Sequence, residues 1–423
     1  MAAETTIQGG ASPYRWWMLI LGSIVEFFVA GMAWSIMPVL FQEIAQPKDI
    51  GLGLTLVQLG AIWGMMPLAM ALLAIPSGIA ADRYGIRWII GFGVLLTAVA
   101  GALRGMSGDF TSLLIWMFLF GVGYALLGTN IPKFLGVWFK SKELGMANGI
   151  VFSCYALGGG FAIQFGGAFF SPAVGGWRNV LYILGIISLV LGIMWLITVK
   201  TPKTSGGKTG AAEKGAVSQQ GLFHGLVVGF RTRDVWLLAV CQMLYLGGYL
   251  GALGYLPMYL TERGMSKAMA HGYLSLILYL GVVGKTLVPM ISDWLGTRKY
   301  AYAVSISITG ICLMLVPFTS GTALLALLGT WGICTGGYVI PRIIPPEHPR
   351  IGPALTGSVF GFMTTVGFIG GFLSPITVNA IAAKSGGAPA IVLCSSFLLV
   401  AALIFLFVTE THPKRAPKVG QAS

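Results

Sequence analysis

The sequence predicts an all-α membrane protein, with twelve transmembrane helices in two pseudo-symmetric six-helix bundles. Hydrophobic residues make up 56% of the chain and charged residues 9%, with a mean hydropathy of +0.84. Soluble domains are about 45–50% apolar and about 25% charged. The apolar runs reach about 20 residues, the length of a membrane-crossing helix, and lack the alternation of barrel strands. Because lipid cannot satisfy backbone polar groups, these runs must fold as helices.

Each uninterrupted apolar run is assigned one span. The first 15 residues are mostly polar, and the first apolar run is too long for a signal-peptide core, so we expect this span to remain. The expected spans are 16–40, 55–80, 88–106, 112–139, 145–170, 178–199, 235–261, 269–292, 300–318, 322–345, 354–383 and 388–409.

The distribution of lysine and arginine predicts the orientation. An even number of spans places both termini on one side, and if that side is cytoplasmic its segments hold 17 of the 26 basic residues. This bias follows the positive-inside rule. We expect a multi-pass inner-membrane protein with cytoplasmic termini, whose net charge of +13 reflects topology and not a nucleic-acid partner. The loops on the outer side are expected to hold six basic residues: Lys48, Arg104, Arg178, Arg263, Lys267 and Lys384.

Cysteine and histidine give no sign of a metal site or a cofactor. The five cysteines all fall within spans, and no CxxC or Cys/His cluster occurs. No nucleophile–base arrangement is apparent either. We therefore expect no cofactor and no enzymatic activity.

A long polar stretch divides the chain after six spans. It runs from Lys200 to Gly221 and is rich in Gly, Ser, Thr and Lys, which is typical of a flexible linker. The expected organisation is an N-terminal bundle at 1–199, a cytoplasmic linker at 200–234, and a C-terminal bundle with a short tail at 235–423.

The two halves share three short motifs in the same order, separated by nearly constant offsets of 209 to 211 residues. Such duplication is typical of secondary transporters, whose substrate site lies between the halves near the bilayer midplane. The matched pairs are Asp82-x-x-Gly85-x-Arg87 with Asp293-x-x-Gly296-x-Arg298, Ile131–Lys133 with Ile340–Arg342, and Gly159–Phe161 with Gly370–Phe372.

The first of these motifs carries a family resemblance. The stretch GIAADRYGIR, Gly78 to Arg87, resembles the loop 2–3 signature of the major facilitator superfamily, and WRNVLYILG, Trp177 to Gly185, resembles its entry to span 6. The resemblance covers essentially the whole chain. It implies the six-plus-six fold and transport by alternating access.

In that family the loop acid contacts a helix N-terminus across the two halves and holds the cytoplasmic side shut. The resemblance therefore implies a gate; alternatively, these charges merely mark a cytoplasmic turn. Its residues would be Gly78, Asp82, Arg83, Gly85 and Arg87 in the first half, with Asp293, Gly296 and Arg298 in the second.

Two departures from the family pattern bear on coupling. Members often carry an arginine in span 4, where this chain has Met117, and antiporters often carry a Gly-Pro pair in span 5, whereas the stretch 156–167 has no proline. The second departure favours symport or uniport, although glycine-rich packing would also explain it.

Ionisable residues deep in a span are functional hypotheses by default. Glu26 lies ten residues after Trp16, roughly 15 Å into the membrane, and could carry the coupling proton. The alternative is a permanently neutral acid that is hydrogen-bonded to a neighbouring helix.

Lys285 lies eight residues before Asp293, roughly 12 Å from the cytoplasmic edge. Its position resembles that of a carboxylate-binding arginine in the family's monocarboxylate and oxalate carriers. A lysine there offers a point charge without the bidentate fork. We expect anion binding, with a structural ion pair, for example to Glu26, as the alternative.

Lys133 and Arg342 occupy matching places near the cytoplasmic ends of spans 4 and 10, each directly after a proline that should loosen its helix. Two cations at the inner mouth of the expected cavity would attract an anion, unless both side chains snorkel to the headgroups. Asn130, Tyr249 and Tyr279 are further candidate substrate contacts, although packing roles would also explain them.

These charges favour a small organic anion, a carboxylate or sulfonate, moved by proton symport through Glu26. Organophosphate exchangers resemble one another in carrying arginine in spans 1 and 7, and nitrate porters carry arginine in spans 2 and 8. Sugar symporters need several acids within their spans. This chain has none of these three sets of residues. The expected partners are the anion, a proton or other coupling ion and the bilayer, with the protein a monomer. The alternatives are efflux of amphipathic compounds and a membrane ligand sensor that does not transport.

Overall fold

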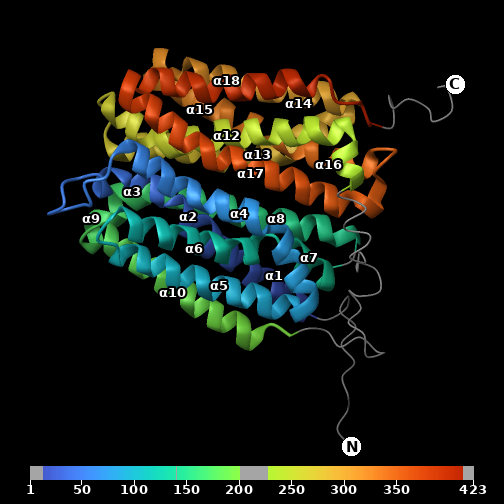
Figure 1. The fold of residues 1–423 in the computed structure, drawn as a ribbon, viewed down its shortest axis with the longest axis horizontal. Coiled ribbons are helices and arrows are strands. Elements are labelled where there is room, and N and C mark those ends of the chain that lie inside the picture. The colour runs from blue at the N-terminus through green and yellow to red at the C-terminus, as the bar shows by residue number, and fades with distance from the viewer. Residues whose placement is uncertain (1–12, 140, 201–226, 413–423) are drawn as a thin grey trace, which may run out of the picture.

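The computed structural model describes residues 13–139, 141–200 and 227–412. Twelve helical segments in this part of the chain are long and apolar enough to cross a membrane. Figure 1 shows them as two layers: the N-terminal half in blue to green and the C-terminal half in yellow to red. Most of the expected linker lies outside the described residues. We call the side that carries Tyr14, Thr198 and His412 the terminal side, and the other the opposite side.

In the N-terminal half, spans 1, 3, 4 and 5 consist of more than one helical segment, because each changes its helix type or breaks within the span. Span 1 is α1 (Tyr14–Val25), the π-helix η1 (Glu26–Met32), α2 (Ala33–Ser35) and α3 (Met37–Ile44). Span 2 is α4 (Leu56–Tyr84), span 3 is α5 (Ile86–Leu103) with η2 (Arg104–Met106), and span 4 is α6 (Phe110–Gly128) with α7 (Ile131–Trp138). Span 5 is α8 (Ser141–Phe165), the π-helix η3 (Gly166–Phe170) and α9 (Ser171–Val174), and span 6 is α10 (Trp177–Thr198).

In the C-terminal half, spans 7, 8, 11 and 12 are single α-helices, whereas spans 9 and 10 consist of more than one segment. They are α12 (Arg233–Glu262), α13 (Lys267–Leu295), α14 (Arg298–Leu315) with η4 (Val316–Phe318), α15 (Gly321–Cys334) with η5 (Thr335–Val339) and α16 (Ile340–Glu347), α17 (Gly352–Ser385) and α18 (Gly387–Phe405). The expected loosening at the two prolines is confirmed: Pro132 stands at the start of α7 and Pro341 at the start of α16.

Local sequence signals set the helix ends. Thr55 begins α4 with a capping box, in which its hydroxyl accepts a hydrogen bond from the backbone N–H of Gln58. Gly85 turns the chain between α4 and α5 at φ 91°, and Gly296 ends α13 at φ 67°. Both conformations lie where a side chain would be strained, which explains why the repeated motif keeps glycine at these two places.

Small residues bring the two halves together. A Cβ atom on Gly60 in α4 would lie 2.4 Å from the carbonyl oxygen of Pro375 in α17, and one on Gly160 in α8 would lie 2.4 Å from the ring of Tyr279 in α13. Backbones approach this closely only where no side chain intervenes. The two seams, α4 with α17 and α8 with α13, therefore hold the halves against each other.

Candidate functional site

Glu26 begins the π-helical segment in the middle of span 1. Its side chain is buried, and its Oε1 atom has no hydrogen-bond partner among the described residues. Gly31 in the same segment lies against span 5, where an added Cβ would be 2.4 Å from the carbonyl oxygen of Tyr155. π-Helical turns are frequent at functional sites, and this one carries Glu26 at its start and packs against span 5 through Gly31.

An aromatic cluster surrounds Glu26 in the N-terminal half. The hydroxyl groups of Tyr124 and Tyr155 are hydrogen-bond partners, and the charge of Glu26 acts on both. Trp34 stacks on Trp63 at 4.9 Å between ring centroids and lies 6.4 Å from Tyr155. Glu26 therefore lies within electrostatic range of two tyrosine hydroxyl groups, without a hydrogen bond to either among the described residues.

A matching cluster in the C-terminal half carries cations. Tyr245 stacks on Tyr338 at 4.6 Å, and Nη2 of Arg342 donates a 2.6 Å hydrogen bond to the Tyr338 hydroxyl. Lys285 is half-buried and forms no hydrogen bond or salt bridge with any described residue, while the charge of Arg342 acts on it. These two like charges therefore have no carboxylate partner in the described parts of the chain.

The two clusters face each other across the halves. Tyr155 is an electrostatic neighbour of Tyr249, and Tyr124 is a neighbour of Tyr338 and Arg342. The structure thus brings together four of the residues expected from the sequence: Glu26, Lys285, Tyr249 and Arg342. We call this group, with Tyr124, Tyr155, Tyr245 and Tyr338, the central cluster.

Three other expected contacts lie elsewhere. Asn130 is buried and donates 2.8 Å to the hydroxyl of Ser77, so its amide packs spans 2 and 4 together. Tyr279 donates a 2.9 Å hydrogen bond to Oε1 of Gln164 across the seam between α8 and α13. Lys133 pairs with Asp82, a residue of its own half, and also reaches the carbonyl oxygen of Gly78 at 3.4 Å.

The gate residues form contacts within each half. Asp82 pairs with Lys133, and Arg87 donates to the carbonyl oxygen of Leu196, whereas the side chain of Arg83 is exposed beside the ring of Tyr84. In the second half Nη1 of Arg298 pairs with Asp293 at 2.5 Å and Nη2 with Glu347 at 2.8 Å. Every salt bridge formed between described residues on the terminal side joins partners of the same half.

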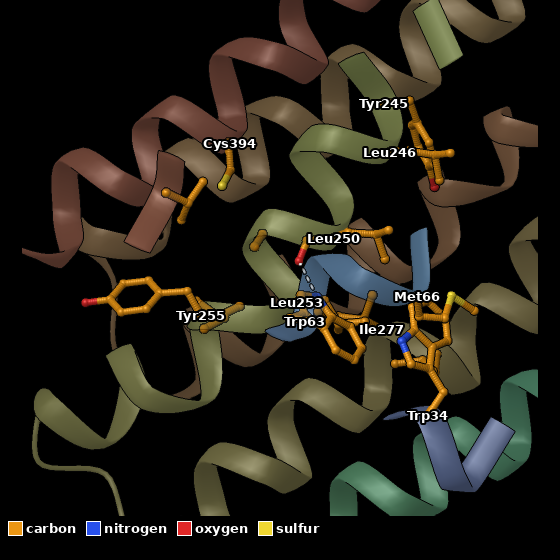
Figure 2. Packing of buried hydrophobic residues seen from close by; sticks show 14 of the residues in the cluster. Trp34, Trp63, Met66, Tyr245, Leu246, Leu250, Leu253, Tyr255, Ile277 and Cys394 are labelled. Carbon is orange, nitrogen blue, oxygen red and sulfur yellow. Dashed lines mark hydrogen bonds between the residues drawn. The ribbon is translucent and has the colours of Figure 1, made fainter. Parts of the chain in front are cut away.

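Hydrogen bonds join the halves from the middle of the membrane to the opposite side. The indole N–H of Trp63 donates to the carbonyl oxygen of Leu250 at 3.0 Å, and Figure 2 shows this bond reaching from α4 into α12 beside Trp34. Gln42 also donates to Thr261. Together with the bond between Tyr279 and Gln164, these contacts hold the opposite side closed, while no hydrogen bond between described residues joins the two halves on the terminal side.

Arg104 corrects the expectation that it lies in an outer loop. It is fully buried: Nη2 donates 2.9 Å to the carbonyl oxygen of Ala33, and the guanidinium lies 4.1 Å from the ring centroid of Phe120. Its Nη1 atom reaches the sulfur of Met117 at 3.5 Å. The sequence did not indicate this burial, because an arginine near the end of a span is normally solvated.

Comparison with known proteins fits this architecture. Residues 19–375 match the profile of the Major Facilitator Superfamily. The chain belongs to this superfamily. It is a multi-pass membrane transporter and not an enzyme, as both the family and its relatives indicate.

Its relatives are distant but match nearly end to end. The chain is 25% identical to the protein named "Probable sulfoacetate transporter SauU" of Cupriavidus necator, over 88% of this chain and 90% of that protein. It is also 25% identical to the "Probable galactarate/D-glucarate transporter GudP" of Escherichia coli, over 88% of each. A third relative, also 25% identical, is the "Probable nitrate/nitrite antiporter NarK1" of Thermus thermophilus, over 94% of this chain and 92% of that protein.

A solved structure shares the fold. A bacterial homologue of the human lysosomal transporter Spinster, in an inward-facing and unoccupied conformation, superposes with a TM-score of 0.76 at 18% sequence identity. The match covers 94% of this chain and 98% of that one. At this identity the likeness concerns the fold alone.

Proposed function

We propose that this transporter moves a small organic anion, a carboxylate or sulfonate, by alternating access, with Lys285 and Arg342 binding the anionic group. One observation carries the proposal: these two cations lie in the central cluster without a carboxylate partner among the described residues. Lys285 is half-buried and has the like charge of Arg342 acting on it, so a bound anion offsets the repulsion between them. The names of the sulfoacetate and galactarate relatives are consistent with such a substrate.

Proton symport through Glu26 is the coupling that we propose. The acid is buried in the same cluster as the two cations. In its charged form it would compete with the substrate for these cations, whereas in its protonated form it would not. Transport of the anion together with a proton also moves less net charge through the low-dielectric interior. The terminal side is assigned to the cytoplasm by the bias of lysine and arginine.

Thermal unfolding of the purified protein tests the binding site. A ligand that binds only the folded state stabilises it by about 2.7 kcal/mol at 100 times its dissociation constant. We expect sulfoacetate or a sugar dicarboxylate to raise the melting temperature of the wild type and of Lys384→Ala, whose lysine is exposed at the end of α17. The shift should disappear in Lys285→Ala. An equal shift in Lys285→Ala would refute the assignment.

The alternative, efflux of amphipathic compounds, has one observation in its favour. A recess within the N-terminal half, between spans 1, 5 and 6, is lined entirely by apolar side chains, including Phe28, Phe161 and Leu184. If lipophilic cations stabilise the protein and organic anions do not, this alternative replaces the anion carrier.

A further inference from the structure

His271 is a fully buried histidine that the proposed mechanism does not use. It lies one turn into α13, near the opposite side, with no exposed surface. Neither ring nitrogen has a hydrogen-bond partner among the described residues. An unpaired buried imidazole is unfavourable in either tautomer, and its cation would be far more so.

The ring lies in the seam that closes the opposite side. A Cβ atom on Gly167 of η3 would lie 2.9 Å from Cε1 of His271 and 2.5 Å from the carbonyl oxygen of Val39. Gly167 and Val39 belong to the N-terminal half, and His271 belongs to the C-terminal half. The bond between Tyr279 and Gln164 joins the same two spans, 8 and 5, about two turns further along α13. His271 is therefore shielded from water because the two halves meet there.

No acid near the ring is available to pair with an imidazolium. The charged residue that acts on it is Lys267, one turn earlier on α13, and its charge opposes a second cation. Of the elements packed against this end of α13, η3 and α15 carry no charged residue. α3 contributes Glu43, whose Oε2 already accepts a 2.5 Å bond from Ser171.

The opposite-side end of α12 carries Glu262, and Arg263 follows it directly; both charged groups are also engaged. Glu262 accepts a 3.1 Å bond from the hydroxyl of Tyr255, and Nη1 of Arg263 donates 2.8 Å to the carbonyl oxygen of Val316. Tyr259 lies beside Arg263, with the guanidinium 5.8 Å from its ring centroid. While the seam is closed, the ring is therefore held in its neutral form.

We propose that His271 is a proton-binding site of the opposite-side gate, vacant while the seam is closed and filled from the opposite side when it opens. Opening separates the ring from Gly167 and admits water, which removes the desolvation cost of the cation. Because a ligand favours the state that it binds better, protons on that side favour the open state. The inference rests on the alternating access of the proposed function, but not on the substrate or on Glu26.

A distance measurement between the two halves tests this without substrate. Spin labels on Ile50→Cys and Phe318→Cys, both exposed on the opposite side, would report opening once the native cysteines are replaced. A single linked proton changes the ratio of open to closed forms by at most about tenfold per pH unit. We expect the wild type to open as the pH falls from about 8 to about 5, the range in which histidine titrates.

Matched variants separate a proton site from a structural role. His271→Gln and His271→Phe should show no pH response, and His271→Phe should fold at least as stably because it buries no unpaired nitrogen. His348→Gln is the control, since His348 lies on the terminal side and pairs with Asp234 at 3.2 Å. A wild-type response in His271→Gln, or its loss in His348→Gln alone, would overturn the proposal. Failure of anion binding in the thermal test would leave this result unchanged.

Discussion

The Nη1 atom of Arg104 lies 3.5 Å from the Sδ atom of Met117, so a guanidinium from span 3 lies beside the position in span 4 at which the family resemblance implies an arginine. The same group donates to the carbonyl oxygen of Ala33, directly after the π-helix in span 1. The buried cation is thus supplied by a neighbouring helix. It ties span 3 to the segment that carries Glu26.

This relationship predicts the outcome of a residue exchange. Arg104→Met leaves the Ala33 carbonyl unpaired in the core, which should lower the free energy of unfolding by about 1–3 kcal/mol. The double variant Arg104→Met with Met117→Arg returns a guanidinium to the same space and should recover most of the loss. Thermal unfolding in detergent measures both. If the double variant recovers none of the lost free energy of unfolding, the position of the cation depends on more than its contact with Met117.

Glu26→Gln should preserve substrate exchange but abolish proton-driven substrate accumulation. The amide keeps the size of the side chain but cannot gain or lose a proton, so substrate exchange across liposomes should persist while uptake driven by a pH gradient disappears. Glu43→Gln, which also changes an acid of span 1, should retain driven uptake. Full accumulation by Glu26→Gln would exclude this residue as the coupling site.

The pair of Asp82 and Lys133 should matter for transport more than for stability. Their side chains are 54% and 38% exposed, and such surface pairs contribute about 0–1 kcal/mol. Asp82→Asn should therefore change unfolding by less than about 1 kcal/mol but lower the transport rate about tenfold or more if Asp82 works as a gate. Glu143→Gln, which breaks the nearby 2.7 Å pair with Arg15, is the matched control. Equal transport by both variants would show that the charges only mark the turn.

Glu410 predicts a pH dependence of stability. Burial acts to raise its pKa, but hydrogen bonds from the Thr297 hydroxyl and the backbone N–H of Arg298 outweigh burial and lower it below the ordinary value of 4.5. A lowered pKa means that the charged form stabilises the fold above about pH 4.5 and that this stability is lost as the pH falls further. An acid at a helix N-terminus typically contributes about 1 kcal/mol.

Unfolding measured from about pH 7 down to about pH 3 tests this. The wild type should lose stability over the acid end of the range, and Glu410→Gln should start lower and lose less there. A parallel pH profile for the two proteins would mean that the carboxylate does not cap α14.

Most of the fold could be predicted because lipid leaves few choices. The twelve spans are confirmed, with ends that shift by a few residues: the first was expected at 16–40 and lies at Tyr14–Ile44. Glu26 and Lys285 stood out because a charge is costly at their depth. Whether they pair was left open, and no salt bridge joins them in the described part of the chain.

The rest depended on three-dimensional relations that a single sequence does not contain. Tyr124, Tyr155 and Tyr338 look like ordinary packing residues, since a tyrosine within a span carries no unusual cost. Only the meeting of five spans, 1, 4, 5, 8 and 10, makes them a cluster around an acid and two cations. Arg104 was misplaced for a related reason, because its burial depends on a backbone carbonyl of another helix.

The π-helix at Glu26–Met32 also has a consequence for comparing this chain with others. A π-turn closes its hydrogen bond one residue later than an α-turn, so the segment holds surplus chain relative to an α-helix of the same height. Each α-helical residue turns the helix by about 100°. A relative with an unbroken first helix would therefore align here only across a gap, and ungapped positions beyond Met32 would be compared on the wrong face.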